Sequence, residues 1–163
     1  MYRIVMTFLP FMLNACSDCS VKLDSIVSIQ SVRFKEEYCF DEPSAAGEGF
    51  KMIVLSLSEE TTKDFVERSD KSTFPLDKDR YAVSYWQRTP ITPKWQEAKE
   101  LVANYFLHSE PAKAYQKQIE RALDGQDSFY AFYYRSVVGN IVDIQFFLID
   151  PSVNKMYIVM NKI

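Results

Sequence analysis

Three cysteines and a single histidine are the residues of this chain whose types most readily carry redox, metal or nucleophilic chemistry. Cys16 and Cys19 have the CxxC spacing of a thiol–disulfide redox motif or of half a zinc site. A tetrahedral zinc site needs four ligands, and only Cys39 and His108 remain to complete one. A redox CxxC is expected between a strand and a helix, whereas this one directly follows a hydrophobic leader. We therefore predict no metal site, no redox centre and no cofactor.

Nucleophilic catalysis through a histidine would depend on His108, which lies at the expected end of a helix. At that position an exposed or capping histidine is the commoner role. The sequence contains no glycine-rich phosphate loop, no HExxH and no GxSxG. Adjacent carboxylates occur at Glu36-Glu37, Asp41-Glu42 and Glu59-Glu60. Because adjacent side chains do not face each other on a helix or strand, these pairs predict solvated surface, no catalytic residue and a protein that is not an enzyme.

The N-terminus combines one positive charge, Arg3, with an uncharged hydrophobic run over residues 4–13. This run is too short to span a bilayer and has the length of the hydrophobic region of a secretion signal. The alternative is a buried strand of a cytosolic protein, which Pro10 in the middle of the run disfavours. The run leads into Leu13-Asn14-Ala15-Cys16, which resembles the lipobox of bacterial lipoproteins: Leu, a tolerant position, Ala or Gly, then Cys.

The resemblance covers the signal segment alone, and it implies a signal peptide over residues 1–15 with Cys16 as the lipidation site. In that family the cysteine thiol receives a diacylglycerol, with acyl chains such as palmitate, and the peptide is cut just before it. Ser17 after the cysteine favours the outer membrane over retention in the inner membrane. The implied protein is held to the membrane by its lipid anchor and faces the periplasm.

Export would place the remaining thiols in an oxidising compartment. If Cys16 carries the lipid, Cys19 and Cys39 are left, and the periplasm permits a disulfide between them. Such a bridge would close a loop of about twenty residues, for which chain entropy predicts a stabilisation of roughly 3 kcal/mol.

The chain length of 163 residues fits one domain, which we place at 26–163 after a polar tether at 16–25. Hydrophobic residues make up 47% of the chain, enough for a sizeable core. The net charge is −3 and no dense basic run occurs, so we expect no nucleic acid partner.

Hydrophobic periodicity divides the domain into alternating and helical segments. Strands are expected over 26–36, 50–57, 81–86, 129–138, 141–149 and 156–160, and helices after Ser58, from Pro93 to Phe106 and from Ala112 to Leu123. This order predicts an α+β fold: an antiparallel sheet of five or six strands with about three helices packed on one face and a C-terminal three-stranded meander. Gly139-Asn140 reads as a two-residue turn, which would place Val138 opposite Ile141.

Aromatic residues are unusually frequent, with 10 Tyr, 12 Phe and 2 Trp. The run at 129–134 has aromatic side chains on both faces of its strand, one face more than a simple core needs. Tyr and Trp are enriched at recognition surfaces, although helices and N-terminal strands could instead cover both faces. The candidate binding surface consists of Tyr130, Phe132, Tyr134, Phe147 and Ile149.

These features together predict a lipid-anchored cell-envelope protein that acts by binding another envelope protein. Immunity against a delivered toxin, inhibition of an envelope enzyme and support of an outer-membrane complex all fit a small domain on a lipid tether. No residue motif selects among them. The alternatives are a small-molecule or lipid-binding envelope module, with the aromatic residues lining a cavity, and a carboxylate-based hydrolase.

Overall fold

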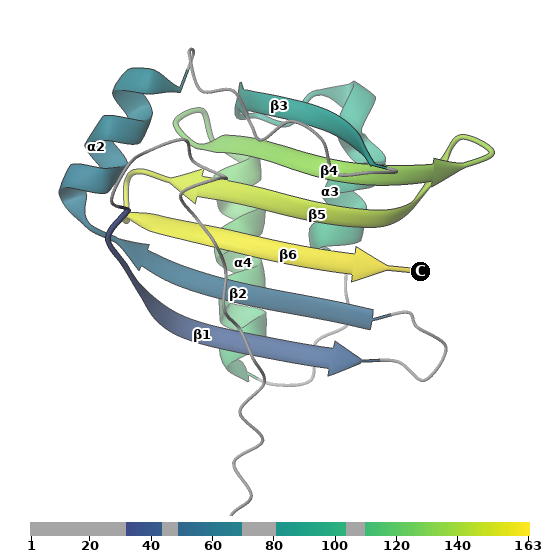
Figure 1. The fold of residues 1–163 in the computed structure, drawn as a ribbon, viewed down its shortest axis with the longest axis horizontal. Helices are drawn as coiled ribbons and strands as arrows, with labels where there is room; N and C mark the ends of the chain where they lie inside the picture. Colours follow the sequence, from purple (N-terminus) through teal and green to yellow (C-terminus); the bar gives the residue numbers. More distant parts are fainter. Residues whose placement is uncertain (1–31, 44–48, 70–80, 104–109) are drawn as a thin grey trace, which may run out of the picture.

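The computed structural model describes residues 32–43, 49–69, 81–103 and 110–163. They form six strands, three α-helices and one 3-10 turn (Figure 1). In chain order the elements are β1 (Phe34–Pro43), β2 (Gly49–Leu57), α2 (Glu59–Arg68), β3 (Ala82–Arg88), η1 (Pro93–Trp95), α3 (Gln96–Ala103), α4 (Glu110–Asp124), β4 (Phe129–Val137), β5 (Asn140–Asp150) and β6 (Lys155–Lys162).

The six strands form a single sheet in the order β1-β2-β6-β5-β4-β3, and every neighbouring pair is antiparallel. Strands β4, β5 and β6 are neighbours both in sequence and in space, which confirms the predicted C-terminal meander. Strand β2 pairs with β6, so the first hairpin and the meander join into one sheet. The predicted α+β class is confirmed.

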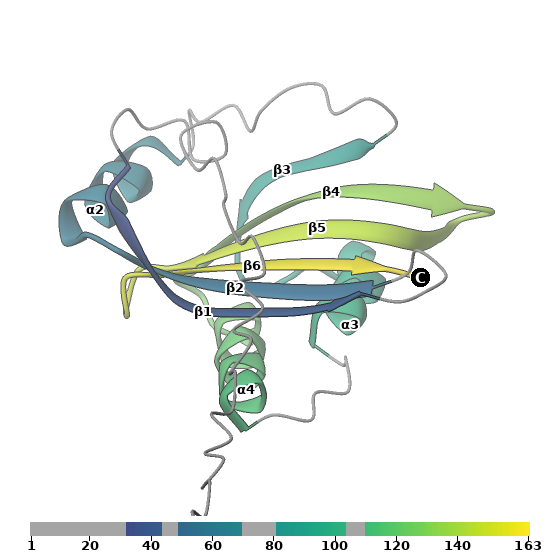
Figure 2. The same ribbon diagram turned by 60° about the horizontal axis from the view of Figure 1, so that its bottom comes forward.

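Helices cover both faces of this sheet. Helices α3 and α4 lie together on one face, and α2 lies on the opposite face near one end (Figure 2). Val102 of α3 and Ile119 of α4 belong to one buried cluster, while Phe65 of α2 belongs to the other. The expectation that all helices share one face therefore holds for α3 and α4 alone.

Local sequence signals account for the helix starts. The Ser58 side chain accepts a hydrogen bond of 3.1 Å from the Thr61 N–H, as the predicted N-cap of α2 should. Glu59 and Glu60 follow in the first turn, where carboxylates meet the positive end of the helix dipole. Pro93 begins η1, which leads directly into α3, as expected for proline at the first helical position.

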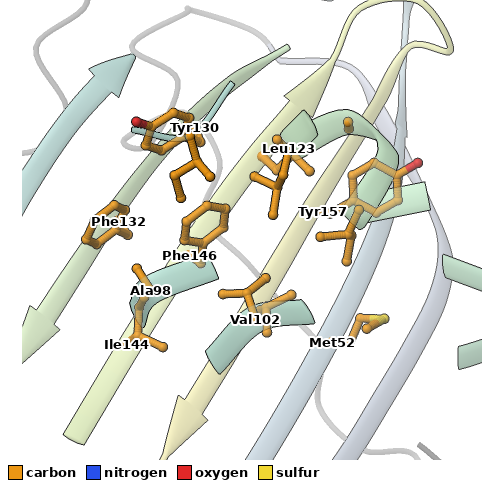
Figure 3. Packing of buried hydrophobic residues seen from close by; sticks show 14 of the residues in the cluster. Met52, Ala98, Val102, Leu123, Tyr130, Phe132, Ile144, Phe146 and Tyr157 are labelled. Carbon is orange, nitrogen blue, oxygen red and sulfur yellow. The ribbon is translucent and has the colours of Figure 1, made fainter. Parts of the chain in front are cut away.

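The core beneath α3 and α4 is built from stacked aromatic rings (Figure 3). The rings of Tyr130 and Phe146 lie 6.0 Å apart at an interplanar angle of 3°, and those of Phe132 and Phe146 lie 5.4 Å apart at 14°. Trp95 meets Phe132 edge to face at 4.9 Å. Ala131, Tyr133 and their neighbours are buried on the opposite face of β4. Because both faces are covered, the strand reads as a nearly continuous aromatic run.

Candidate functional site

The β4–β5 hairpin ends in a turn formed by Val138 and Gly139, flanked by the paired residues Val137 and Asn140. The φ angles of Val138 and Gly139 are 52° and 88°, so both turn residues are left-handed, as a type I′ turn requires. Turns of this type match the right-handed twist of the two strands that they join. In Figure 1 the tip of this hairpin extends beyond the ends of the neighbouring strands β3 and β6.

Val138 adopts the left-handed conformation without gaining any packing. Its side chain is 97% exposed, and that of Val137 beside it is 54% exposed. A β-branched residue at positive φ is a steric outlier that costs about 1–3 kcal/mol. Gly139 avoids this cost because it has no Cβ, and a Cβ added there would meet nothing within 4 Å. The tip thus presents apolar side chains to solvent from a strained backbone.

The base of the hairpin is held in place by two other elements. Glu97 of α3 accepts a hydrogen bond of 2.7 Å from the Ile141 N–H, and Ile163 donates its N–H to the Val142 carbonyl at 3.0 Å. A register shift between Arg135 and Ser136 leaves Val142 as the extra residue of a β-bulge. The protruding tip therefore stands on a base that is fixed from both the helix and the sheet.

An open pocket of about 320 Å³ lies beside this base. The Tyr81 hydroxyl donates a hydrogen bond of 2.5 Å to Asp143 Oδ2, and Lys51 forms an ion pair of 3.0 Å with Asp41. The pocket is lined by Asp41, Gly49, Phe50, Lys51, Tyr81, Asp143, Gln145, Met160, Asn161 and Lys162. Two carboxylates thus line one pocket, and each already has a partner within the chain.

Charges near Asp143 set the electrostatics of this end of the sheet. Asp143 is 8% exposed, and its strand partners are Arg135 on β4 and Lys162 on β6. Burial raises the pKa of Tyr81, and the neighbouring Asp143 carboxylate raises it further, so the phenol stays protonated as a donor. Arg135 and Lys162 are exposed, so the charge offered to solvent beside Asp143 is positive.

A second polar cluster surrounds Glu37, which lies at a register irregularity of β1. Lys155 Nζ lies 2.8 Å from Glu37 Oε2, and the Ser56 hydroxyl donates to Glu37 Oε1. Lys155 also lies over the ring of Tyr115 in α4, 5.3 Å from its centroid. The hydrogen bonds from Lys155 and Ser56 lower the pKa of Glu37. Both carboxylate oxygens are occupied, so this cluster joins β1 and β6 to α4 and has a structural role.

The predicted aromatic surface is distributed over both faces of the sheet. Tyr130 and Phe132 are fully buried beneath α3 and α4, with Tyr134 half-buried beside them. Phe147 and Ile149 are buried in the cluster on the opposite face. These five residues form no common surface, and four of them belong to the core.

The reason is the β-bulge at Val142. The prediction placed the turn at Gly139-Asn140, whereas the chain turns at Val138 and Gly139. Moving a two-residue turn by one position changes the pairing by two residues, so this difference alone would leave Tyr130 and Phe147 on one face. The bulge at Val142 changes the pairing by one residue, so that Tyr130 pairs with Leu148 and Phe147 lies on the opposite face. A one-residue shift moves every side chain of a strand to the other face.

The predicted chemistry-bearing residues fall in different parts of the chain. Cys39 is disulfide-bonded. Cys16, Cys19 and His108 lie outside the described residues. Within the described ranges, no group of three His, Cys, Asp or Glu side chains is arranged to hold a metal ion.

One carboxylate of each adjacent pair lies close to a positive side chain. Glu37 meets Lys155, Asp41 meets Lys51, and the Glu60 carboxylate lies 3.9 Å from Arg33.

Sequence reasoning did not find Val138, Tyr81 or Asp143. A valine followed by glycine between two strands was the available signal for Val138, because a type I′ turn at these two positions forces valine to positive φ. Nothing in the sequence links Tyr81 to Asp143, which are 62 positions apart.

No family model, curated protein or solved structure matches this chain. No helix in the described part of the chain is both long enough and apolar enough to cross a membrane.

Proposed function

We propose that this chain is a lipid-anchored cell-envelope protein that acts by binding another protein through the tip of the β4–β5 hairpin. The observation that carries the proposal is Val138, a fully exposed β-branched residue at positive φ. Its conformation costs folding free energy, and its side chain makes no packing contacts within the chain that would offset this cost. Strained residues of this kind are concentrated at functional sites. A partner protein that buries the Val138 side chain would offset the free-energy cost of its conformation.

The proposed location in the cell envelope rests on the N-terminal sequence and on the disulfide-bonded Cys39. Leu13-Asn14-Ala15-Cys16 resembles a lipobox, with Cys16 as the lipidated residue and Ser17 favouring the outer membrane. The disulfide at Cys39 supports an oxidising compartment such as the periplasm. Immunity, inhibition and accessory support of an envelope complex remain the roles that suit such a protein.

Photo-crosslinking in a Gram-negative host tests this function on the full chain. A photoreactive amino acid replaces Val138 in one strain, and in the control strain it replaces Val153, which is 50% exposed in the turn between β5 and β6. We expect a protein adduct of one defined size from position 138 and none of that size from position 153. Equal labelling from both positions, or no adduct at 138, contradicts binding through the hairpin tip.

The pocket of about 320 Å³ beside the hairpin favours a second candidate, a small-molecule or lipid-binding envelope module. Native mass spectrometry of the chain purified from the host membrane distinguishes the two. A stoichiometric ligand that is lost on changing Gln145, which lines the pocket, supports the second candidate. A ligand-free chain that still forms the adduct at position 138 supports protein binding.

A further inference from the structure

We infer that the partner is a folded envelope protein with a narrow apolar cleft rimmed by acidic side chains, and that the hairpin tip inserts into this cleft. The inference rests on the proposed function and adds the chemistry and the geometry of the contact.

The shape of the tip favours a cleft over a flat surface. Only two residues, Val138 and Gly139, form the turn, and the hairpin extends past its neighbours in the sheet (Figure 1). Val137 and Val138 expose apolar side chains at this end, with the exposed polar residues Ser136 and Asn140 directly behind them. A narrow apolar projection buries most of its surface only when a partner surrounds it.

The charge around the tip favours an acidic rim. Arg135 and Lys162 are exposed beside the hairpin base, although the chain as a whole has a net charge of −3. The nearby carboxylates are already engaged: Asp143 accepts from Tyr81, Glu97 accepts from the Ile141 N–H, and Asp41 pairs with Lys51. The exposed charges beside the hairpin are therefore positive, and acidic groups on a partner would orient the complex.

The fixed base favours insertion without rearrangement. The Ile141 N–H is held by Glu97, and the Val142 carbonyl is held by the Ile163 N–H. A loop that is already ordered loses little conformational entropy on binding, so more of the contact energy appears as affinity. The same positive charges would suit an anionic lipid surface, but the tip lacks the tryptophan, tyrosine or long aliphatic side chains that anchor proteins at a membrane interface.

The test begins with the protein cross-linked at position 138, identified by mass spectrometry and then purified. Its affinity is measured by calorimetry for the wild type, Val138→Asn, Arg135→Gln and the control Val153→Asn, each checked for folding by circular dichroism. We expect Val138→Asn to bind at least about tenfold more weakly, because the apolar contact is lost while the turn is retained. Arg135→Gln should bind several-fold more weakly and show a smaller salt dependence. Val153→Asn should bind like the wild type.

The outcomes separate failure of this inference from failure of the proposed function. If the partner binds Val138→Asn and Arg135→Gln as tightly as the wild type, the tip does not insert into an apolar cleft with an acidic rim. The proposed function of protein binding would still stand. A cross-linked peptide on a flat or basic surface of the partner leads to the same conclusion. An adduct with twice the mass of the chain identifies a second copy and overturns the inference. If the chain binds phosphatidylglycerol vesicles through Val138 and forms no protein adduct, the inference and the proposed function are both overturned. The absence of any adduct at position 138 also overturns both.

Discussion

Val138 and Asn154 share one backbone conformation, with φ angles of 52° and 51°, in the turns at the two ends of β5. Asparagine tolerates the left-handed region because its short polar side chain can bond locally, whereas valine is strongly disfavoured there. The turn between β5 and β6 thus has the residue type that tolerates positive φ, Asn154, whereas the turn between β4 and β5 has a disfavoured one, Val138. The unfavourable residue is also the more exposed, which is the reason for assigning it a role in recognition.

Exchanging residue types between these turns should have opposite effects on stability. Val138→Asn creates an Asn-Gly type I′ turn and should raise the free energy of unfolding by about 1 kcal/mol. Asn154→Val should lower it by about 1–2 kcal/mol, because valine is forced to positive φ. Urea denaturation of the two variants and the wild type measures both changes. A destabilised Val138→Asn would show that Val138 is not strained, and the argument for recognition would lose its basis.

The contact between Glu97 and the Ile141 N–H should hold the hairpin base. Glu97→Ala removes the acceptor of a charge-assisted hydrogen bond and should cost about 1–2 kcal/mol. Hydrogen exchange at the Ile141 amide should accelerate in this variant. Glu100→Ala, at an exposed position on the same helix, is the matched control and should change stability by less than about 0.5 kcal/mol. Unchanged exchange at Ile141 would show that Glu97 does not fix the hairpin.

The pH dependence of stability should report the cluster around Glu37. Its pKa is lowered in the folded chain by the hydrogen bonds from Lys155 and Ser56, so the ionised form stabilises the fold above the unfolded pKa of about 4.3. This contribution is lost as the pH falls through the folded pKa. Glu37→Gln should therefore destabilise by about 1 kcal/mol at pH 7 and by progressively less toward pH 3. Denaturation at several pH values checks this, with exposed Glu36→Gln as the control; a difference that grows on acidification contradicts it.

Substitutions should distinguish the lipidated cysteine, Cys16, from the cysteines of the predicted disulfide, Cys19 and Cys39. Cys19→Ser should free the Cys39 thiol and lower stability by roughly 3 kcal/mol, if Cys19 is the disulfide partner as predicted. Cys16→Ala should leave the disulfide intact and remove the lipid. Thiol counting under denaturing conditions measures the bridge, and membrane fractionation measures the anchor. A free Cys39 in Cys16→Ala would identify Cys16 as the disulfide partner and would contradict its lipidation.

Much of the fold was predictable because the local signals agreed with the tertiary structure. Ser58 with Glu59 and Glu60 marked the start of α2, and Pro93 marked η1 and the helix after it. The C-terminal meander was predictable because short turns join β4, β5 and β6. The face chosen by α2 was not predictable, because its inward residue Phe65 fits either side of a sheet with two apolar faces.

The candidate site was less predictable because it depends on register. Gly139 can occupy either position of a two-residue turn, and both placements leave the same aromatic side chains on each face, whereas the bulge at Val142 changes which of them are buried together. The bulge at Val142 has no distinctive sequence signal. The pairing of Tyr81 with Asp143 arises from strand order, which local patterns do not encode.

The account depends most on the chain being exported and lipidated, since the envelope partner follows from that address. Intact mass spectrometry after expression in a Gram-negative host, with Cys16→Ala alongside the wild type, measures it directly. We predict a wild-type chain that lacks residues 1–15 and carries acyl chains at its N-terminus, with both changes absent from Cys16→Ala. An unmodified wild-type chain that begins at Met1 would contradict the lipoprotein assignment and the periplasmic partner with it.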